Sequence, residues 1–415
     1  MPNTPPNRSG VQATPAVTLT APAAHSQPTP AFDWRALVAQ SQPGDTTANQ
    51  RAQASRLRLA TAELTTWTNQ FGLLPAFVRP SAMFAVVCTP PDAPDDQTRS
   101  LARLILWYYS FDTTLDSQPL ERMGDPAWVD ATIRASVAPL LPDVRPAIAH
   151  GLGWGGVAPT AIETVPPIIG RLSAALADWR ETTFAPWERM APHLLVRQFW
   201  RQTLAEQLVV AATAMRQELA WTSAWRASRF MAPHASGATS AHVAARGALV
   251  APTTTDAALL TAAPTVAAYL RVANRTTGAH PTFALACRGM GCAPTAWAQR
   301  RPLLNAAARV IRLANDASSA EADFADENIT AVTSALLHLP AASTSPIPTA
   351  TEVVGATYVS RQPERALRQA RAQIARRLDA SSDAFARRLA TQPDGPDADY
   401  LRYTVAWALA HYAQP

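Results

Sequence analysis

The sequence of 415 residues predicts an all-α fold, a single helical bundle. Three observations support this prediction. Apolar residues recur at helical spacing along most of the chain, and no convincing alternating strand pattern is present. Hydrophobic residues make up 48% of the chain against 16% charged residues, which is enough to bury a large core.

Five segments have a clear helical pattern. They span residues 97–117, 190–220, 302–325, 364–391 and 398–412. In the first segment, Leu101, Ile105 and Tyr108 lie on one face, and in the third segment Ala307 and Ile311 do so. We therefore expect amphipathic helices that bury these faces together.

Three stretches interrupt the helical pattern. Residues 1–31 are rich in Pro, Thr and Ala and hold too few large apolar residues to offset the entropy of ordering, so we expect a disordered leader. Residues 228–263 have a similar composition and are expected to form an insertion or long loop, and residues 340–351 are a third such stretch. The remainder, residues 32–415, is expected to form one domain.

The basic residues exclude several chemistries. All 36 are arginine, so Schiff-base, pyridoxal-phosphate and P-loop lysine chemistry cannot occur. The net charge is +5 and the arginines are spread among Ala and Leu, so no nucleic acid partner is expected. Cys88, Cys287 and Cys292 have neither disulfide-framework nor zinc-site spacing and are expected to be small buried residues.

No apolar run reaches the roughly 18 residues of a membrane span, and no signal peptide opens the chain. We therefore expect a soluble, cytoplasmic protein with no membrane span.

The first acidic cluster is the Asp112 and Asp116 pair. The two carboxylates are four residues apart, on the apolar face that Ile105 and Tyr108 begin. An ionised carboxylate facing a core is costly unless a cation or hydrogen bonds satisfy it. The pair is either a cation-binding site or a surface pair at a helix end.

The second cluster is Asn315, Ser319 and Asp323, which lie on one line of a helix. Amide, hydroxyl and carboxylate oxygens are hard ligands of the kind that Mg²⁺ takes. The apolar stripe through Val310 and Ile311 leads directly into this line, which indicates a helix that lines a cavity; the alternative is a solvated helix end.

Together the clusters resemble the motifs of bacterial class I terpene synthases (terpene cyclases). Asp112 and Asp116 match the spacing of the family's Asp-rich motif, and Asn315, Asp316, Ser319 and Asp323 match its second motif, N-D-x-x-S-x-x-x-E/D. The resemblance covers about residues 60–415 and implies the class I terpenoid-synthase fold, a single helical bundle with a central apolar cavity. It also implies that Asp112, Asp116, Asn315, Ser319 and Asp323 hold Mg²⁺, as three ions.

The resemblance also implies diphosphate contacts. The stretch from Pro264 to Gly278 is similar to a family segment whose arginine senses the diphosphate, and here Ala273 occupies that position. Arg275, two residues later, is taken as its substitute; the alternative is that the diphosphate contact is altered and Arg275 is a solvated arginine. Arg402 and Tyr403 resemble the family's terminal Arg-Tyr pair. Alternatively, Tyr400 and Trp407 are the aromatic pair that precedes this element, and the Arg-Tyr match is then a coincidence.

The implied function is a class I terpene cyclase. It would ionise a linear isoprenyl diphosphate with Mg²⁺ and cyclise the carbocation, with farnesyl diphosphate favoured and geranyl, methylated geranyl and geranylgeranyl diphosphate left open. Aromatic faces would stabilise the cation; the candidates are Trp107, Tyr108, Phe111, Phe199 and Trp200. A homodimer is left open, and the alternative function is that of a non-catalytic binding protein derived from a degenerate terpene synthase.

Overall fold

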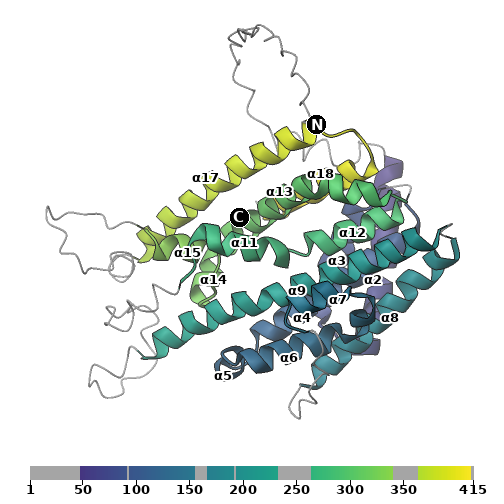
Figure 1. The fold of residues 1–415 in the computed structure, drawn as a ribbon. Helices are drawn as coiled ribbons and strands as arrows, with labels where there is room; N and C mark the ends of the chain where they lie inside the picture. The colour runs from purple at the N-terminus through teal and green to yellow at the C-terminus, as the bar shows by residue number, and fades with distance from the viewer. Residues whose placement is uncertain are drawn as a thin grey trace, which may run out of the picture. The chain divides into compact units, whose positions relative to one another are not determined.

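The computed structural model describes residues 47–90, 93–154, 166–190, 193–231, 263–339 and 363–412, and every regular element in these ranges is a helix (Figure 1). The predicted all-α fold is therefore confirmed. Contacts group residues 33–415 into one compact unit. The predictions for residues 1–31, for residues 340–351 and for most of residues 228–263 lie outside the described residues.

In chain order the described elements are α2 (Thr47–Phe71), η1 (Pro75–Phe77), α3 (Val78–Cys88), α4 (Asp95–Asp116), α5 (Leu120–Met123), α6 (Pro126–Val137), η2 (Ala138–Asp143), α7 (Pro146–Gly151), α8 (Pro167–Met190), α9 (Leu194–Met231), α11 (Val266–Thr276), α12 (Ala279–Gly289), α13 (Pro294–Ser318), α14 (Ala320–Ala325), α15 (Ala331–Leu337), α17 (Pro363–Ala390) and α18 (Pro396–Tyr412).

Four of the five predicted helices appear as single helices, α4, α9, α17 and α18. The prediction of one helix over residues 302–325 is wrong at one point, because α13 ends at Ser318 and α14 begins at Ala320. The intervening Ser319 has φ −88° and ψ 3°, outside the helical region. Its hydroxyl donates to the carbonyl of Asn315 at 2.9 Å, a local bond that competes with helix continuation.

Local sequence signals explain several helix starts. Asp95 and Asp96 stand in the first turn of α4, where the helix dipole favours negative charge. Thr265 caps α11 by accepting the backbone N–H of Ala268, and Pro294 starts α13, where its missing N–H costs no helical hydrogen bond.

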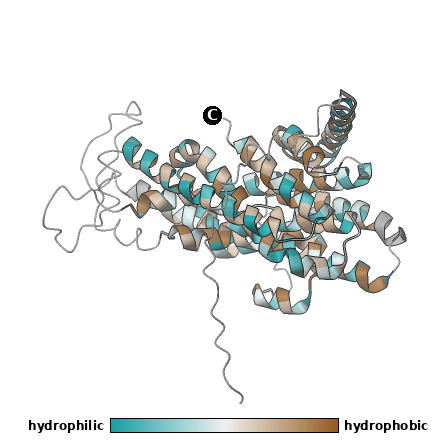
Figure 2. Cartoon of the chain, turned by 90° about the horizontal axis from the view of Figure 1, so that it is seen from above, coloured by the Kyte–Doolittle hydropathy of each residue, from teal (hydrophilic) through white to brown (hydrophobic). Residues whose placement is uncertain are grey.

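Two clusters of buried side chains hold the helices together. The larger cluster joins α2, α3, α4, α6, α8, α9, α12, α13 and α18 around large buried residues such as Trp67, Trp179 and Trp200. The smaller cluster joins α11, α13, α15 and α17 around Tyr269 and Ile374. Most helices carry both hydrophilic and hydrophobic residues along their length (Figure 2), as amphipathic helices around shared cores must.

The break between α11 and α12 lies at Gly278. This residue has φ 71°, a left-handed conformation that glycine adopts without a steric penalty. The break allows the carbonyl of Thr276 to leave the helical pattern and accept the phenolic hydroxyl of Tyr108 on α4 at 2.8 Å. The kinked segment is thereby tied to the helix that carries the first acidic motif.

Candidate active site

The acidic residues of both motifs line one pocket of about 660 Å³, which we call the acidic pocket. Its walls come from the ends of α4 and α13 and from the middle of α9, together with the segment after α14. Its charged and amide-bearing residues are Asp112, Asp116, Glu218, Arg312, Asn315, Asp316, Asp323 and Asn328. Two motifs about 200 residues apart in the chain therefore meet across one cavity, as the sequence predicts.

Asp112 and Asp116 are on the last two turns of α4, and their acidity is strongly perturbed. Burial and the negative charges of Asp116 and Glu218 raise the pKa of Asp112 well above its usual value. Burial and the charge of Glu218 raise the pKa of Asp116 to about 6, although the residue as a whole is exposed. Carboxylates that repel one another at one site favour a bound cation.

The second motif is held by short local contacts. Asn315 lines the pocket directly. Ser319 does not line the pocket, and its one hydroxyl hydrogen is shared between the Asn315 carbonyl and the Asp323 carboxylate. Asp323 also accepts a longer bond from the Asn328 amide at 3.4 Å. After the break at Ser319, Asp323 therefore lines the same pocket as Asn315 and stays in contact with Ser319.

Asp316 has a structural role within the same motif. Its side chain is 0% exposed, accepts the backbone N–H of Ala331 at 2.9 Å and pairs with Arg312 at 3.0 Å. It thus anchors the start of α15 against α13. Burial is the largest influence on its pKa, which is raised, and the guanidinium of Arg312 opposes this shift.

Sequence reasoning missed two residues at the centre of the site, Arg312 and Glu218. Arg312 donates through Nη2 to Glu218 on α9 at 3.1 Å and to the hydroxyl of Tyr269, and its guanidinium lies 5.2 Å from the centre of the Tyr269 ring. Glu218 also accepts the hydroxyl of Thr276 on α11. The guanidinium of Arg312 therefore links α9, α11 and α13 at the wall of the pocket.

A signal for both residues exists in the sequence. Arg312 follows the apolar Val310 and Ile311 directly and precedes Leu313, and Glu218 stands beside Leu219 on a helix whose inner stripe includes Met215. A lone charge within an apolar stripe indicates either a partner of opposite charge or a site. The partner, however, lies on another helix, and the sequence does not reveal that pairing.

The predicted diphosphate residues lie elsewhere. Arg275 is exposed at the end of α11, and Arg402, near the start of α18, pairs with Asp399 and lies 3.9 Å from Asp394. Neither these arginines nor Tyr403 line the acidic pocket. The structure thus brings together the predicted metal ligands and does not bring the three predicted diphosphate residues to them.

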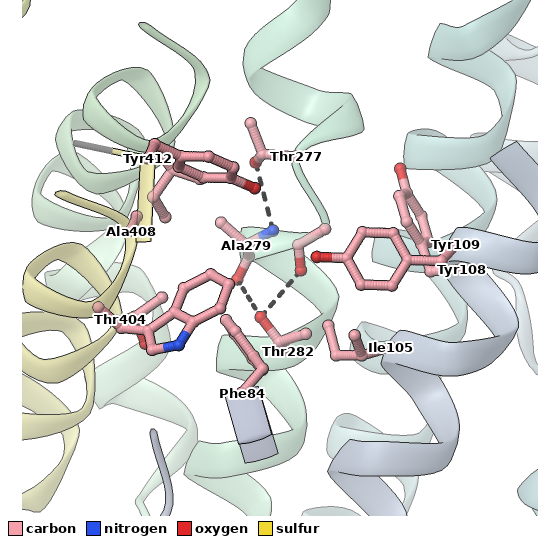
Figure 3. Close-up of a pocket in the computed structure, with 13 residues that line it drawn as sticks. Phe84, Ile105, Tyr108, Tyr109, Thr277, Ala279, Thr282, Thr404, Ala408 and Tyr412 are labelled. Carbon is pink, nitrogen blue, oxygen red and sulfur yellow. Dashed lines mark hydrogen bonds between the residues drawn. The ribbon is translucent and has the colours of Figure 1, made fainter. Parts of the chain in front are cut away.

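A second pocket of about 440 Å³, which we call the apolar pocket, lies between α3, α4, α12, α13 and α18. Its aromatic lining consists of Phe84, Tyr108, Tyr109, Trp407 and Tyr412. Figure 3 shows the Tyr108 ring pointing toward Ala279 and Thr282, with Tyr412 on the other side of the space. Aliphatic and hydroxyl-bearing side chains complete the wall, among them Ile105, Ile311 and Thr404.

The two pockets are neighbours along two helices at once. Tyr108 lines the apolar pocket and Asp112, one turn later on α4, lines the acidic pocket. In the same way Ile311 and Asn315 are one turn apart on α13. Since one turn advances about 5.4 Å, an apolar space and an acidic space adjoin between these helices.

Of the five aromatic residues expected to face a carbocation, only Tyr108 lines the apolar pocket. Trp107 is 0% exposed, donates to the carbonyl of Leu172 and stacks on Phe111, so both belong to the core around α8. Phe199 and Trp200 pack together beside Trp297. Periodicity assigns Trp107 and Phe111 to the interior but does not tell which side of the interior they face.

The oxygen donors of the acidic pocket fit a hard divalent cation. Among the described residues, however, no three acidic, histidine or cysteine side chains are close enough to hold one ion by themselves. Mg²⁺ commonly keeps waters and takes substrate phosphate oxygens in addition to one or two carboxylates. This donor set therefore fits Mg²⁺ ions whose coordination a phosphorylated substrate completes.

Residues 260–344 match the family model of terpene synthase family 2, C-terminal metal binding. The matched range contains α11 to α15 and thus the whole second motif. The resemblance to the terpene synthases is confirmed. The match supports a terpene synthase, and no curated protein matches the sequence.

Two solved structures of terpene synthases are similar to this chain. The isoprene synthase from grey poplar leaves (Populus x canescens), in complex with three Mg²⁺ ions and dimethylallyl-S-thiolodiphosphate, is similar with a TM-score of 0.52 at 13% identity, over 91% of this chain and 60% of that chain. The linalool/nerolidol synthase from Streptomyces clavuligerus, in complex with 2-fluorogeranyl diphosphate, has a TM-score of 0.46 at 17% identity, over 86% of this chain and 94% of that chain. The likeness to the isoprene synthase shows that the helical bundle has the class I terpene synthase fold.

None of the described helices is both long and apolar enough to cross a membrane.

Cys88 and Cys287 are buried and Cys292 is partly buried, and all three are free thiols. For Cys88 and Cys287 this agrees with the expectation of small buried residues.

Proposed function

We propose that this chain is a Mg²⁺-dependent class I terpene cyclase that ionises a linear isoprenyl diphosphate, cyclises the carbocation and releases diphosphate. The observation that carries the proposal is the adjacency of the two pockets. Both α4 and α13 pass within one turn from an aromatic-lined apolar space to a set of carboxylate and amide oxygens. This arrangement suits a substrate with a hydrocarbon tail and a charged head.

The proposed ligands of the metal are Asp112, Asp116, Asn315, Ser319 and Asp323. Mg²⁺, when bound, would supply charge neutralisation of the departing diphosphate. Burial is the largest cause of the raised pKa of Asp112, and the negative charges of Asp116 and Glu218 add to it. These two charges support the assignment, because negative charge that favours a proton also favours a divalent cation.

Arg312 is the arginine that we propose for the diphosphate. It lines the acidic pocket, whereas Arg275 and Arg402 do not. Its Nη2 is occupied by Glu218 and Tyr269, and its Nη1 has no hydrogen-bond partner among the described residues. An arginine fixed on one side by a carboxylate is pre-organised to donate its other N–H groups to a phosphate oxygen.

The apolar pocket would hold the isoprenyl chain away from water. The faces of Tyr108, Tyr109 and Trp407 can stabilise a passing carbocation through their ring quadrupoles. Farnesyl diphosphate is the favoured substrate, and geranyl, methylated geranyl and geranylgeranyl diphosphate are the other candidates.

The test is incubation of the purified protein with each of the four diphosphates and Mg²⁺, followed by gas chromatography with mass spectrometry. We expect a cyclic hydrocarbon or alcohol from at least one substrate and none after chelation of the metal. If none of the four yields a product, the chain is a non-catalytic relative and the proposal is wrong.

A further inference from the structure

A third cavity lies on the other side of α13, away from the two pockets described above. It is a groove of about 950 Å³ between α13 and α17, closed at one side by the end of α11. Its polar lining consists of Asn274, Asn305, Arg309, Arg377, Ser381 and Arg388. Neither metal motif contributes a residue to it.

Helical spacing explains why these side chains share one groove. On α17 the lining residues lie three, four, seven and eleven positions after Arg377, so they form one stripe along the helix. On α13 the stripe includes Asn305 and Arg309. The ion pair of Arg371 with Glu321, at 2.9 Å, places the start of α17 beside the segment that follows α13, so the two helices run antiparallel.

The groove is strongly and locally positive. Among the described residues, Arg309, Arg377 and Arg388 have no ion pair, whereas Arg368 and Arg371 on the same helix pair with glutamates. The α17 sequence holds seven arginines against one glutamate and two aspartates. Unneutralised arginines in a concave site attract anions and present planar forks that match phosphate oxygens.

The remaining lining residues indicate what else the ligand carries. Asn305 engages His280 through its amide oxygen at 2.9 Å, which leaves its amide N–H groups to donate. Small apolar side chains, those of Ala306, Ala380 and Ala384, form part of the wall and allow close approach of an uncharged part of a ligand. Arg377 and Arg388 are eleven residues apart, about 16 Å along the helix. Two separate anionic groups therefore match these two arginines better than a single phosphate group does.

We propose that this groove binds a phosphorylated small molecule that bears at least two anionic groups. A concave site of this size between two helices fits a small molecule better than a flat, extended surface such as a membrane. The proposal does not rest on the proposed cyclase activity, because no lining residue of the groove belongs to the acidic pocket.

Calorimetric titration with inorganic tripolyphosphate, in the presence of a chelator of divalent cations, tests the proposal. Chelation removes any metal-dependent binding at the acidic pocket. We expect saturable binding at one site, with inorganic phosphate binding at least about tenfold more weakly because it offers a single anionic group.

Matched variants locate the site. Arg377→Gln and Arg388→Gln should each weaken tripolyphosphate binding about tenfold. Arg376→Gln and Arg387→Gln remove the same charge from exposed neighbours that do not line the groove, and should leave the affinity within about twofold. Asp112→Asn should also bind normally, and circular dichroism should show an intact fold in every variant.

Three results would overturn the proposal. One is the absence of saturable binding by the wild-type protein. Another is an equal loss in the groove variants and their neighbours, which would indicate diffuse electrostatic attraction. The third is that the protein has no tripolyphosphate site but sediments with phosphatidylcholine–phosphatidylglycerol vesicles, and that all four arginine variants weaken this vesicle binding alike. That result would assign the arginines to binding of an anionic membrane surface.

Discussion

Arg312 is the residue on which the interior of the site depends. It is surrounded by Glu218, Asp316 and Tyr269, and the two carboxylates raise its pKa in opposition to burial. A buried carboxylate that loses its only cation is costly, because neither water nor a neighbour replaces the lost charge. Arg312 therefore supports the folded state as well as the proposed contact with diphosphate.

We predict that Arg312→Met lowers the free energy of unfolding by about 3 kcal/mol, as measured by urea denaturation, because Asp316 is left buried beside Glu218 without a counter-charge. Arg301→Met, on the exposed face of the same helix, should change it by less than about 0.5 kcal/mol. Equal effects of the two changes would show that the buried ion pairs contribute nothing specific.

Asn315→Ala should lower kcat by about a hundredfold or more, because it removes a proposed metal ligand from the mouth of the site. Its stability should be unchanged, because the neighbouring bonds from Ser318 and Ser319 go to the backbone carbonyl of Asn315 and not to its side chain. Steady-state kinetics and urea denaturation measure the two quantities. Retained activity would remove Asn315 from the ligand set.

At the scale of elements, the kink between α11 and α12 aligns the site. The left-handed Gly278 lines the apolar pocket, and Thr276 before it contacts both Tyr108 and Glu218. Three helices are thus connected through a segment of three residues. The geometry of the kink should matter to stability and to activity alike.

We predict that Gly278→Ala destabilises the protein by about 1 kcal/mol, because an L-residue is strained at φ 71° even though a Cβ would meet only Tyr108, at 3.8 Å. Gly170→Ala in α8 is the matched control: its Cβ meets nothing within 4 Å, and alanine is the better helix former. It should be neutral or stabilise by up to about 1 kcal/mol. The same sign for both changes in thermal denaturation would contradict the account of the kink.

The elements also show how far the sequence alone leads. Apolar periodicity locates α4, α9, α17 and α18 because these helices bury a face along most of their length. The break at Ser319 carries no Pro or Gly signal and arises from local side-chain bonds, so the apolar periodicity does not predict it.

Asp112 and Asn315 are recognisable from local spacing, whereas Glu218 depends on a pairing between α9 and α13 that only the tertiary structure supplies. Arg275 does not line the pocket because its side chain is exposed at the end of α11, whereas Ala273, two residues earlier, is buried.

At the scale of the whole molecule, the site joins distant parts of the chain. The acidic pocket needs α4, α9 and α13 in place, and α15 is tied to it through the bond from Ala331 to Asp316. A ligand that bridges these helices should stabilise the folded protein as a unit, because it binds the native state and not the unfolded chain.

Mg²⁺ together with inorganic diphosphate should therefore raise the melting temperature, by an amount equivalent to about 2.7 kcal/mol at a hundred times the dissociation constant. The comparison is with diphosphate plus chelator, which isolates the metal-dependent part. Asn315→Ala should lose that part and Arg376→Gln should keep it. A shift that is the same with and without Mg²⁺ would place the bound diphosphate outside the acidic pocket.

We propose that one substrate occupies both pockets, with its head between α4 and α13 and its tail against the aromatic wall. A crystal structure with Mg²⁺ and an unreactive fluorinated farnesyl diphosphate tests it most directly. We predict metal ions contacting Asp112 and Asn315, a diphosphate oxygen within hydrogen-bond distance of Arg312, and the isoprenyl chain against Tyr108 and Trp407. A diphosphate bound away from Asp112 and Asn315, or a chain outside the apolar pocket, would contradict the account.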